Sequence, residues 1–302
     1  MTLESFEITR VFLLSAISFF VALLWLPLLM RLLTALKIGK TIRSSSVAPI
    51  MAKVHEKKVG TPTMGGILVW VTVLVLALVL SQIGVWFPGS FLAKLSFLTR
   101  SQTLLPLGAL VASAVVGLFD DYFNARGIGA CGGGLTMRHR LLVYTLIASV
   151  GAWWFQYKLD WDLLHIPFIG DFNIGFWYIP FFITVIVATA FSVNETDGLD
   201  GLSGGTLFIA FGAYAVIALA QGKYDLAAFC GVIIGALLAF LWFNIYPAKF
   251  FMGDTGAMSL GVTLGIVSIV CGIRPISPRG NRTLTLFSVM RFSSRGNTPT
   301  TG

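Results

Sequence analysis

Charged residues are absent from eight long stretches of this chain. Each stretch carries no Asp, Glu, Lys or Arg and is apolar over most of its length. Each is therefore long enough, or nearly so, for the ~20 helical residues that cross a hydrocarbon core. We predict eight transmembrane helices and an all-α, polytopic membrane fold. The predicted spans are 11–30, 65–86, 104–119, 141–157, 175–193, 203–220, 226–246 and 256–273.

The polar segments between these spans divide between two faces of a membrane. Because successive helices enter from alternate sides, the loops after the first, third, fifth and seventh spans share one face. Those loops carry ten Lys and Arg residues, whereas the segments on the opposite face, outside the C-terminal tail, carry five. The positive-inside rule places the first face in the cytoplasm. Its loops are 37–64, 120–140, 194–202 and 247–255.

Composition supports a membrane protein and argues against other classes. Hydrophobic residues make up 56% of the 302 residues and charged residues 11%, whereas a soluble domain carries about 25% charged residues. The net charge of +8 fits loops in contact with anionic membrane lipid rather than nucleic acid, since no basic run is interleaved with aromatic residues. We expect a transmembrane domain at 1–273 and a polar, disordered tail at 274–302.

Five aspartates from three separate loops follow predicted spans on the cytoplasmic face. They are Asp120, Asp121, Asp197, Asp200 and Asp254. Carboxylates brought together repel one another unless a cation lies between them, and their oxygens are ligands that Mg²⁺ prefers. The clustering predicts a site for a divalent cation or a basic substrate group, although the adjacent aspartate pair alone also fits a solvated helix end. If 194–200 is helical, Asn194, Asp197 and Asp200 project from neighbouring positions.

A glycine- and threonine-rich motif opens the second predicted span: Gly60-Thr61-Pro62-Thr63-Met64-Gly65-Gly66. Thr61 is placed to cap this helix, and Pro62 to occupy its first position, where the missing N–H costs nothing. Free amides at a helix start also attract anions, and Lys57 and Lys58 lie just before the motif. Two interpretations stay open, a well-capped membrane helix beside interfacial lysines and a contact site for a phosphate group.

Four motifs, in this order, resemble the phospho-N-acetylmuramoyl-pentapeptide transferases, a family of polyprenyl-phosphate phospho-sugar transferases. The first is the motif at 60–66, and the resemblance covers about residues 10–270. The forms of the first and last motifs are similar to this branch rather than to the sibling branch that uses UDP-N-acetylhexosamines. The other three are Asp120-Asp121-Tyr122, Asn194-Glu195-Thr196-Asp197-Gly198-Leu199-Asp200-Gly201-Leu202, and Phe243-Asn244-Ile245-Tyr246-Pro247-Ala248-Lys249 with Phe251-Met252-Gly253-Asp254-Thr255-Gly256.

The resemblance implies an enzyme of the bacterial inner membrane with ten helices, often a homodimer, and a Mg²⁺-dependent site that faces the cytoplasm. Such an enzyme transfers phospho-MurNAc-pentapeptide from UDP-MurNAc-pentapeptide to undecaprenyl phosphate, giving lipid I and UMP. The family continues past the eighth helix with two helices and a triple-histidine motif, which the sequence from Cys271 onward does not match. We therefore expect a truncated or frame-shifted chain. The alternatives are an inactive homologue that binds nucleotide sugar or lipid, and a UDP-N-acetylhexosamine transferase.

The resemblance also assigns roles to single residues. It implies that Asp254 is the Mg²⁺ ligand. Asp254 is also one of four catalytic carboxylates, and the other three are Asp120, Asp121 and Asp197. The expected substrate contacts are Lys58, Thr61, Arg140, Asn194, Asp200, Asn244 and Phe251. Lys58 is expected to contact phosphate, and Asn244 and Phe251 the uridine side. Arg140 stands where the family usually has a lysine, and the two residue types are not interchangeable as phosphate contacts.

The chemistry leaves two roles open for Asp120. It is either the base that deprotonates the lipid phosphate, or a group that orients this phosphate or holds metal-bound water while the phosphate attacks directly. A phosphate monoester loses its second proton near pH ~6, so at neutral pH most of the acceptor is already dianionic. We favour direct attack, with Mg²⁺ and basic side chains neutralising the charge on the leaving UMP.

Overall fold

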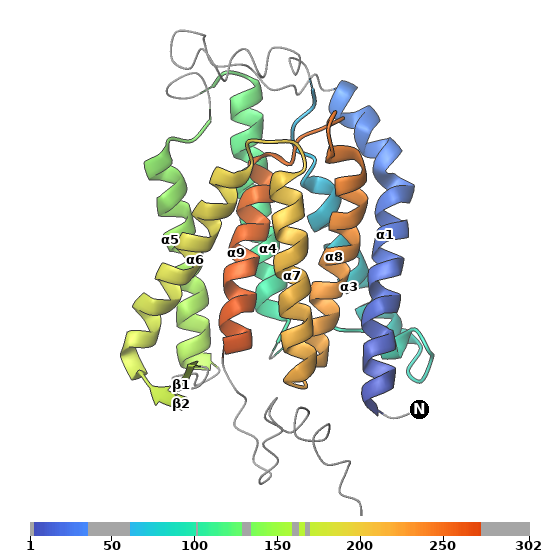
Figure 1. Ribbon diagram of the computed structural model, residues 1–302, viewed down its shortest axis with the longest axis vertical. Coiled ribbons are helices and arrows are strands. Elements are labelled where there is room, and N and C mark those ends of the chain that lie inside the picture. The colour runs from blue at the N-terminus through green and yellow to red at the C-terminus, as the bar shows by residue number, and fades with distance from the viewer. Residues whose placement is uncertain are drawn as a thin grey trace, which may run out of the picture.

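The computed structural model describes residues 3–35, 61–100, 102–128, 134–158, 163–166 and 170–272. These residues form a single bundle of eight long helices (Figure 1). The long helices are α1 (Leu3–Ala35), α3 (Ile67–Trp86), α4 (Leu104–Ala125), α5 (Met137–Lys158), α6 (Tyr178–Thr196), α7 (Leu202–Ala220), α8 (Tyr224–Asn244) and α9 (Gly253–Gly272). Two short 3-10 helices, η2 (Ala93–Leu95) and η4 (Gly175–Trp177), lie between long helices. The predicted tail and Lys58 lie outside the described residues.

The all-α prediction is confirmed, and each predicted span coincides with a helix. Seven of the described helices are long and apolar enough to cross a membrane. The exception is α5, which contains the predicted span 141–157 but also carries Arg138 and Arg140 in its first turn and Lys158 at its end. With 22 residues, α5 is as long as most of the other helices. It differs from the seven in being less hydrophobic.

A small β-hairpin departs from the all-helical expectation. The strands β1 (Leu163–Ile166) and β2 (Gly170–Asn173) pair antiparallel. They join α5 to α6 at the end of the bundle away from the aspartates (Figure 1). Each strand has four residues, too few for a periodic pattern to reveal, because strand formation depends on the pairing partner as much as on local sequence.

The interior of the bundle is formed by α8 and α9. Figure 1 shows α9 among α4, α6 and α7, while α8 packs against α1, α3 and α7. Small residues permit these close approaches, as expected where helices pack in lipid without a hydrophobic driving force between them. Gly235 of α8 lies against the backbone of Ser15 in α1, and Gly261 of α9 lies against Ala190 in α6. Helix α9, whose first turn carries Asp254, is thereby held close to α6.

The predicted cap of the second span is wrong. Helix α3 begins at Ile67 with Gly66 at the N-cap position, and no side chain caps it. Thr61 and Pro62 therefore lie before the helix rather than at its first turn. Met64 has a φ of 71°, a left-handed conformation that is uncommon for a residue with a β-carbon. Contacts with another part of the chain are needed to hold this segment.

Segment 61–66 pairs with the loop that joins α8 to α9. The amides of Gly65 and Gly66 donate to the carbonyl oxygens of Phe251 and Met252, each at 2.8 Å. These bonds occupy two of the amides predicted to be free for an anion, so that interpretation is wrong for both glycines. The error has a physical cause, since the pairing partner lies far along the chain and leaves no trace in the local pattern.

The substitution Gly235→Ala is expected to destabilise the bundle. A β-carbon at this position would be in close contact with the carbonyl group of Ser15, and overpacking costs typically about 1–3 kcal/mol. The midpoint of thermal unfolding in detergent should therefore fall. Gly212→Ala in α7 is the matched control, because nothing lies within 4 Å of a β-carbon there. Equal midpoints for the two variants would contradict the close packing of α1 on α8.

Candidate active site

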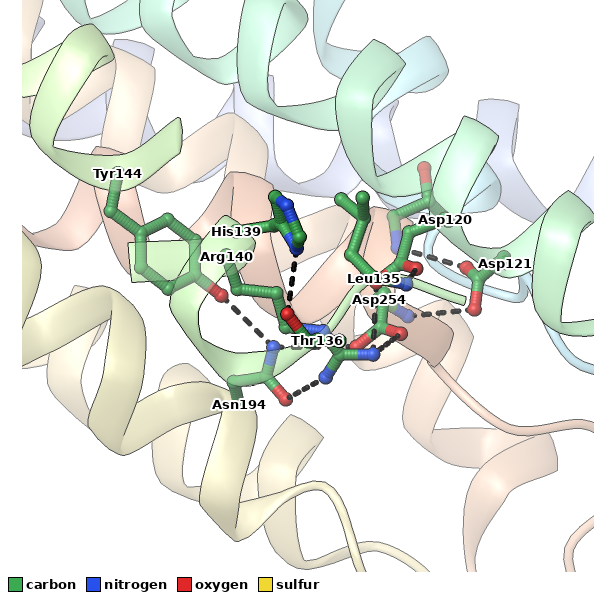
Figure 2. Close-up of polar contacts among 10 residues, drawn as sticks. Asp120, Asp121, Leu135, Thr136, His139, Arg140, Tyr144, Asn194 and Asp254 are labelled. Atoms are coloured by element: carbon green, nitrogen blue, oxygen red, sulfur yellow. Dashed lines mark hydrogen bonds and ion pairs between the residues drawn. The ribbon is translucent and has the colours of Figure 1, made fainter. Parts of the chain in front are cut away.

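Polar side chains from four helices meet at one end of the bundle. They come from the ends of α4 and α6 and from the starts of α5 and α9, and Figure 2 shows the contacts that link them. All five aspartates singled out above contribute to this end, through contacts with one another's helices or with the loop before α9. Their gathering, predicted from the alternation of spans, is confirmed. The compartment that this end faces stays a prediction.

Arg140 lies between two carboxylates. Its Nη2 is 2.7 Å from Oδ2 of Asp254 and 2.8 Å from Oδ2 of Asp120, and its Nη1 is 3.4 Å from Oδ1 of Asn194 (Figure 2). Burial alone would lower the pKa of Arg140, but the attraction of Asp254 and then of Asp120 raises it above its ordinary value. The guanidinium is therefore a permanent cation within the acidic cluster.

Asp120 is fully buried; its Oδ1 has a hydrogen-bond partner, whereas its Oδ2 has an ion-pair partner but no hydrogen bond within the described residues. Besides the ion pair with Arg140, Oδ1 accepts a hydrogen bond from the Leu135 amide in the turn before α5. Gly134 precedes that amide with a φ of 76°, and a β-carbon there would meet Oδ1 of Asp120 at 2.8 Å. Only glycine adopts this conformation readily, so the turn closes onto Asp120 because residue 134 has no side chain.

Asp121 has a different environment from its neighbour. Its Oδ1 accepts a hydrogen bond from the Asp254 amide at 3.0 Å, and its Oδ2 accepts one from the Thr255 amide at 2.9 Å. These amides belong to the first turn of α9, where backbone donors have no partner within the helix and the helix dipole favours negative charge. Asp121 thus caps α9 and fixes the backbone that carries Asp254, while its predicted catalytic role stays a prediction.

Asn194 and Tyr144 orient the side chain of Asp254. The amide nitrogen of Asn194 donates to Oδ1 of Asp254 at 3.3 Å and to the hydroxyl of Tyr144 at 2.9 Å. The sequence analysis did not identify Tyr144. A signal was present, since Tyr144 follows Arg140 by four residues and so lies on the same face of α5.

The condition of one helix through 194–200 is not met. Helix α6 ends at Thr196, and Asp197 follows with φ −78° and ψ 55°, outside the helical region. Asn194 therefore faces Arg140 and Asp254, while the two aspartates contact backbone amides beyond α8. Asp197 accepts a bond from Gly253 at 3.2 Å, and Asp200 accepts one from Ala248 at 3.3 Å.

Asn244 holds together two turns near the site. Its Oδ1 accepts a hydrogen bond from the Gly201 amide at 3.0 Å, and its Nδ2 donates to the Phe250 carbonyl at 2.9 Å. Phe251, the next residue, is mostly buried, and Thr61 lies half-buried at the start of segment 61–66, which pairs with this loop. The structure gives Asn244 a bracing role, and its contact with uridine, like that of Phe251, stays a prediction.

A metal site is not preformed in the part of the chain that the structure describes. No group of three or more His, Cys, Asp or Glu side chains there is arranged to hold a metal ion. The contacts explain this result, because Arg140 lies between Asp120 and Asp254, and Asp121 directs both of its oxygens at amides. The atoms facing Arg140 are nevertheless carboxylate and amide oxygens, which are the donor type that Mg²⁺ prefers.

Comparison with known proteins identifies the family. Residues 103–272 match the family Glycosyl transferase family 4. A phospho-N-acetylmuramoyl-pentapeptide-transferase from Chloroflexus aurantiacus (strain ATCC 29366 / DSM 635 / J-10-fl) is 39% identical over 270 residues, which cover 87% of this chain and 68% of that protein. The chain belongs to the phospho-N-acetylmuramoyl-pentapeptide-transferases of glycosyl transferase family 4. The resemblance carried by the four motifs is thereby confirmed.

Other phospho-N-acetylmuramoyl-pentapeptide-transferases show the same extent of similarity. One from Geobacillus sp. (strain WCH70) is 39% identical over 259 residues, covering 84% of this chain and 73% of its own length. Another from Clostridium novyi (strain NT) is 35% identical over 256 residues, covering 84% and 72%. The matched family region spans α4 to α9 and therefore contains every residue of the cluster around Arg140. With its seven apolar helices, the chain is a multi-pass membrane transferase.

The substitution Asp121→Asn is expected to destabilise the protein, because each carboxylate oxygen accepts one hydrogen bond from the first turn of α9, and asparagine replaces one of these oxygens with an NH2 group that cannot accept. Loss of an N-terminal cap costs about 0.5–2 kcal/mol, so the midpoint of thermal unfolding in detergent should fall. Glu195→Gln is the control, since it removes one negative charge at the same end from an exposed side chain. If both variants unfolded at the same temperature, the proposed cap would be without effect.

Proposed function

We propose that this chain transfers phospho-MurNAc-pentapeptide from UDP-MurNAc-pentapeptide to undecaprenyl phosphate, giving lipid I and UMP. The observation that carries the proposal is the joining of Asp120, Arg140, Asn194 and Asp254 at one end of an apolar bundle, in a chain 39% identical to transferases of that name. The acceptor is a lipid with a charged head. A polar cluster at the end of membrane helices suits such a substrate.

Mg²⁺ is the proposed cofactor, with Asp254 as its ligand. Oxygens of Asp254, Asp120 and Asn194 converge on one guanidinium, and such hard oxygen donors suit Mg²⁺. Asp121 holds the backbone of Asp254 and Asn194 holds its carboxylate, and such supporting bonds orient a metal ligand. When bound, the ion would supply positive charge to the donor diphosphate.

The substrate contacts in this proposal surround the loop before α9. Asp200 and Asn244 fix that loop, and Phe251 lies within it. We place the uridine beside this loop, Arg140 at the diphosphate, and Asp197 and Asn194 next to the reacting groups. Thr61 is the first residue of segment 61–66, which pairs with the same loop, whereas Lys58 is outside the described residues.

The proposed setting is the bacterial inner membrane, with the cluster toward the cytoplasm and the enzyme assembled as a homodimer. The excess of basic residues in the loops on the cluster's face supports this orientation. It also agrees with the supply of a charged nucleotide sugar, which is soluble in water and would reach the site from that side.

Direct attack by the lipid phosphate is the proposed mechanism. Both oxygens of Asp120 are engaged, one by the Leu135 amide and one by Arg140. Each oxygen of Asp120 thus already faces a donor group of the protein itself. The role proposed for Asp120 is therefore to position Arg140 and the acceptor.

Purified protein supplied with UDP-MurNAc-pentapeptide and undecaprenyl phosphate is expected to release UMP only when Mg²⁺ is present. Asp254→Ala should abolish release, because it removes the proposed ligand, while Glu195→Gln should leave it unchanged. UDP-N-acetylglucosamine serves as a competing donor. UMP release from that donor alone would favour the sibling activity, and donor binding without any release would favour an inactive homologue.

Asp120→Asn is expected to reduce turnover by a similar factor on both sides of about pH 6, where a phosphate monoester loses its second proton. A positioning role does not depend on the protonation of the acceptor, so the ratio of variant to wild-type turnover should stay flat with pH. A deficit that appeared only at acidic pH, with metal affinity near normal, would instead identify Asp120 as the base.

A further inference from the structure

We propose that Tyr144 is a positioning residue for the transfer reaction, which holds the side-chain amide of Asn194 in the place from which that amide steadies Asp254. The inference rests on the proposed function for the role of Asp254 as the metal ligand. Tyr144 is fully buried, and Figure 2 shows its hydroxyl directed at Nδ2 of Asn194. The same nitrogen also contacts Asp254, so the action of Tyr144 passes through Asn194.

The lengths of the contacts made by Asn194 show which of them holds its side chain. Nδ2 lies 2.9 Å from the hydroxyl of Tyr144 but 3.3 Å from Oδ1 of Asp254. Oδ1 of Asn194 lies 3.4 Å from Nη1 of Arg140. Because N–H···O bonds normally span about 2.7–3.2 Å, the bond to Tyr144 is the one of these three within the usual range. Tyr144 therefore determines where the amide lies, and the two longer contacts follow from that position.

Tyr144 also differs from the other two partners in its chemistry. Arg140 and Asp254 are the groups that the proposed function assigns to the diphosphate and to Mg²⁺, so their contacts with Asn194 change when those ligands bind. The Tyr144 hydroxyl is uncharged, and its ring is fixed by complete burial in α5, which packs against α6, the helix that carries Asn194. It therefore provides the amide with a partner that stays in place through the reaction.

The same contacts set which end of the amide faces Asp254. A carboxamide has an oxygen that accepts and an NH2 group that donates two hydrogens. Arg140 donates to the oxygen, while the NH2 group contacts both Tyr144 and Asp254. A flipped amide would place its oxygen against the carboxylate oxygen of Asp254. Held as it is, Asn194 donates to Oδ1 of Asp254 and leaves Oδ2 facing Arg140.

Mn²⁺ titration of the purified protein in lipid nanodiscs, followed by electron paramagnetic resonance without any nucleotide, tests the proposal. Tyr144→Phe removes only the hydroxyl. It is expected to weaken Mn²⁺ binding by about three- to tenfold, which is less than the roughly 10–100-fold cost of losing a group bonded directly to a metal ligand, because Tyr144 is one bond further away.

Tyr178→Phe is the matched control. It removes a second fully buried hydroxyl, which has no hydrogen-bond partner within the described residues and lies at the other end of α6. Its Mn²⁺ affinity should equal that of the wild type. An unchanged affinity in Tyr144→Phe, an equal loss in both variants, or a wild type that binds no Mn²⁺ would overturn the proposal.

The number of sites in the same titration separates positioning from folding. Partial unfolding would reduce the number of Mn²⁺ sites per protein, whereas a displaced amide lowers the affinity of each site. Tyr144→Phe should therefore keep the wild-type number of sites. Fewer sites of unchanged affinity would assign the hydroxyl to folding and would contradict the proposal.

A double-mutant comparison tests whether Tyr144 acts through Asn194. Asn194→Ala should weaken Mn²⁺ binding at least as much as Tyr144→Phe, and the two changes together should cost no more than Asn194→Ala alone, because both interrupt one chain of bonds. Additive losses would overturn the proposal. So would wild-type affinity in Asn194→Ala, a result that is decisive even if Tyr144→Phe does not fold.

None of these measurements requires turnover. A wild type that bound Mn²⁺ with the expected response to Tyr144→Phe but released no UMP would refute the proposed function and leave the role of Tyr144 standing.

Discussion

The bonds from the Asp121 carboxylate to the first amides of α9 are the interaction on which the site depends. Asp254 is the second residue of α9, so the position of its side chain follows from the position of that helix end. Gly253 has a φ of 74°, and a β-carbon there would lie 2.6 Å from Asp121. Gly117 of α4 likewise lies against the backbone of Asp254. The close approach permitted by Gly117 and Gly253, together with the carboxylate of Asp121, therefore fixes the site to α4.

This arrangement determines where positive charge is available. The N-terminus of a helix commonly binds anions, but at α9 the amides of Gly253, Asp254 and Thr255 already serve Asp197 and Asp121. The helix end is thus committed to holding the protein's own carboxylates. Charge for a diphosphate must come from side chains or from a metal ion, and Arg140 is the cation that the described cluster places there.

The sequence predicted the large features and missed those made by distant contacts. Runs without charge located all eight long helices, and the alternation of spans brought Asp120, Asp197 and Asp254 to one end. The pairing of 61–66 with the loop before α9 could not be foreseen, because backbone hydrogen bonds between remote segments carry no residue signature. The same holds for the ion pairs of Arg140, since a spacing within α5 does not reveal which carboxylates of α4 and α9 face it.

Two glycines meet where α3 and α9 begin. A β-carbon on Gly66 would contact the backbone of Gly256, and one on Gly256 would contact Gly66 in return. When two side chains collide, a smaller residue at one position can compensate for a larger residue at the other. For Gly66 the nearest obstacle is the main chain of Gly256, which no second mutation can make smaller, whereas a β-carbon on Gly256 would first meet the side chain of Met252. A side chain at residue 66 would therefore require α3 and α9 to move apart, and no change elsewhere in the sequence could restore their present separation.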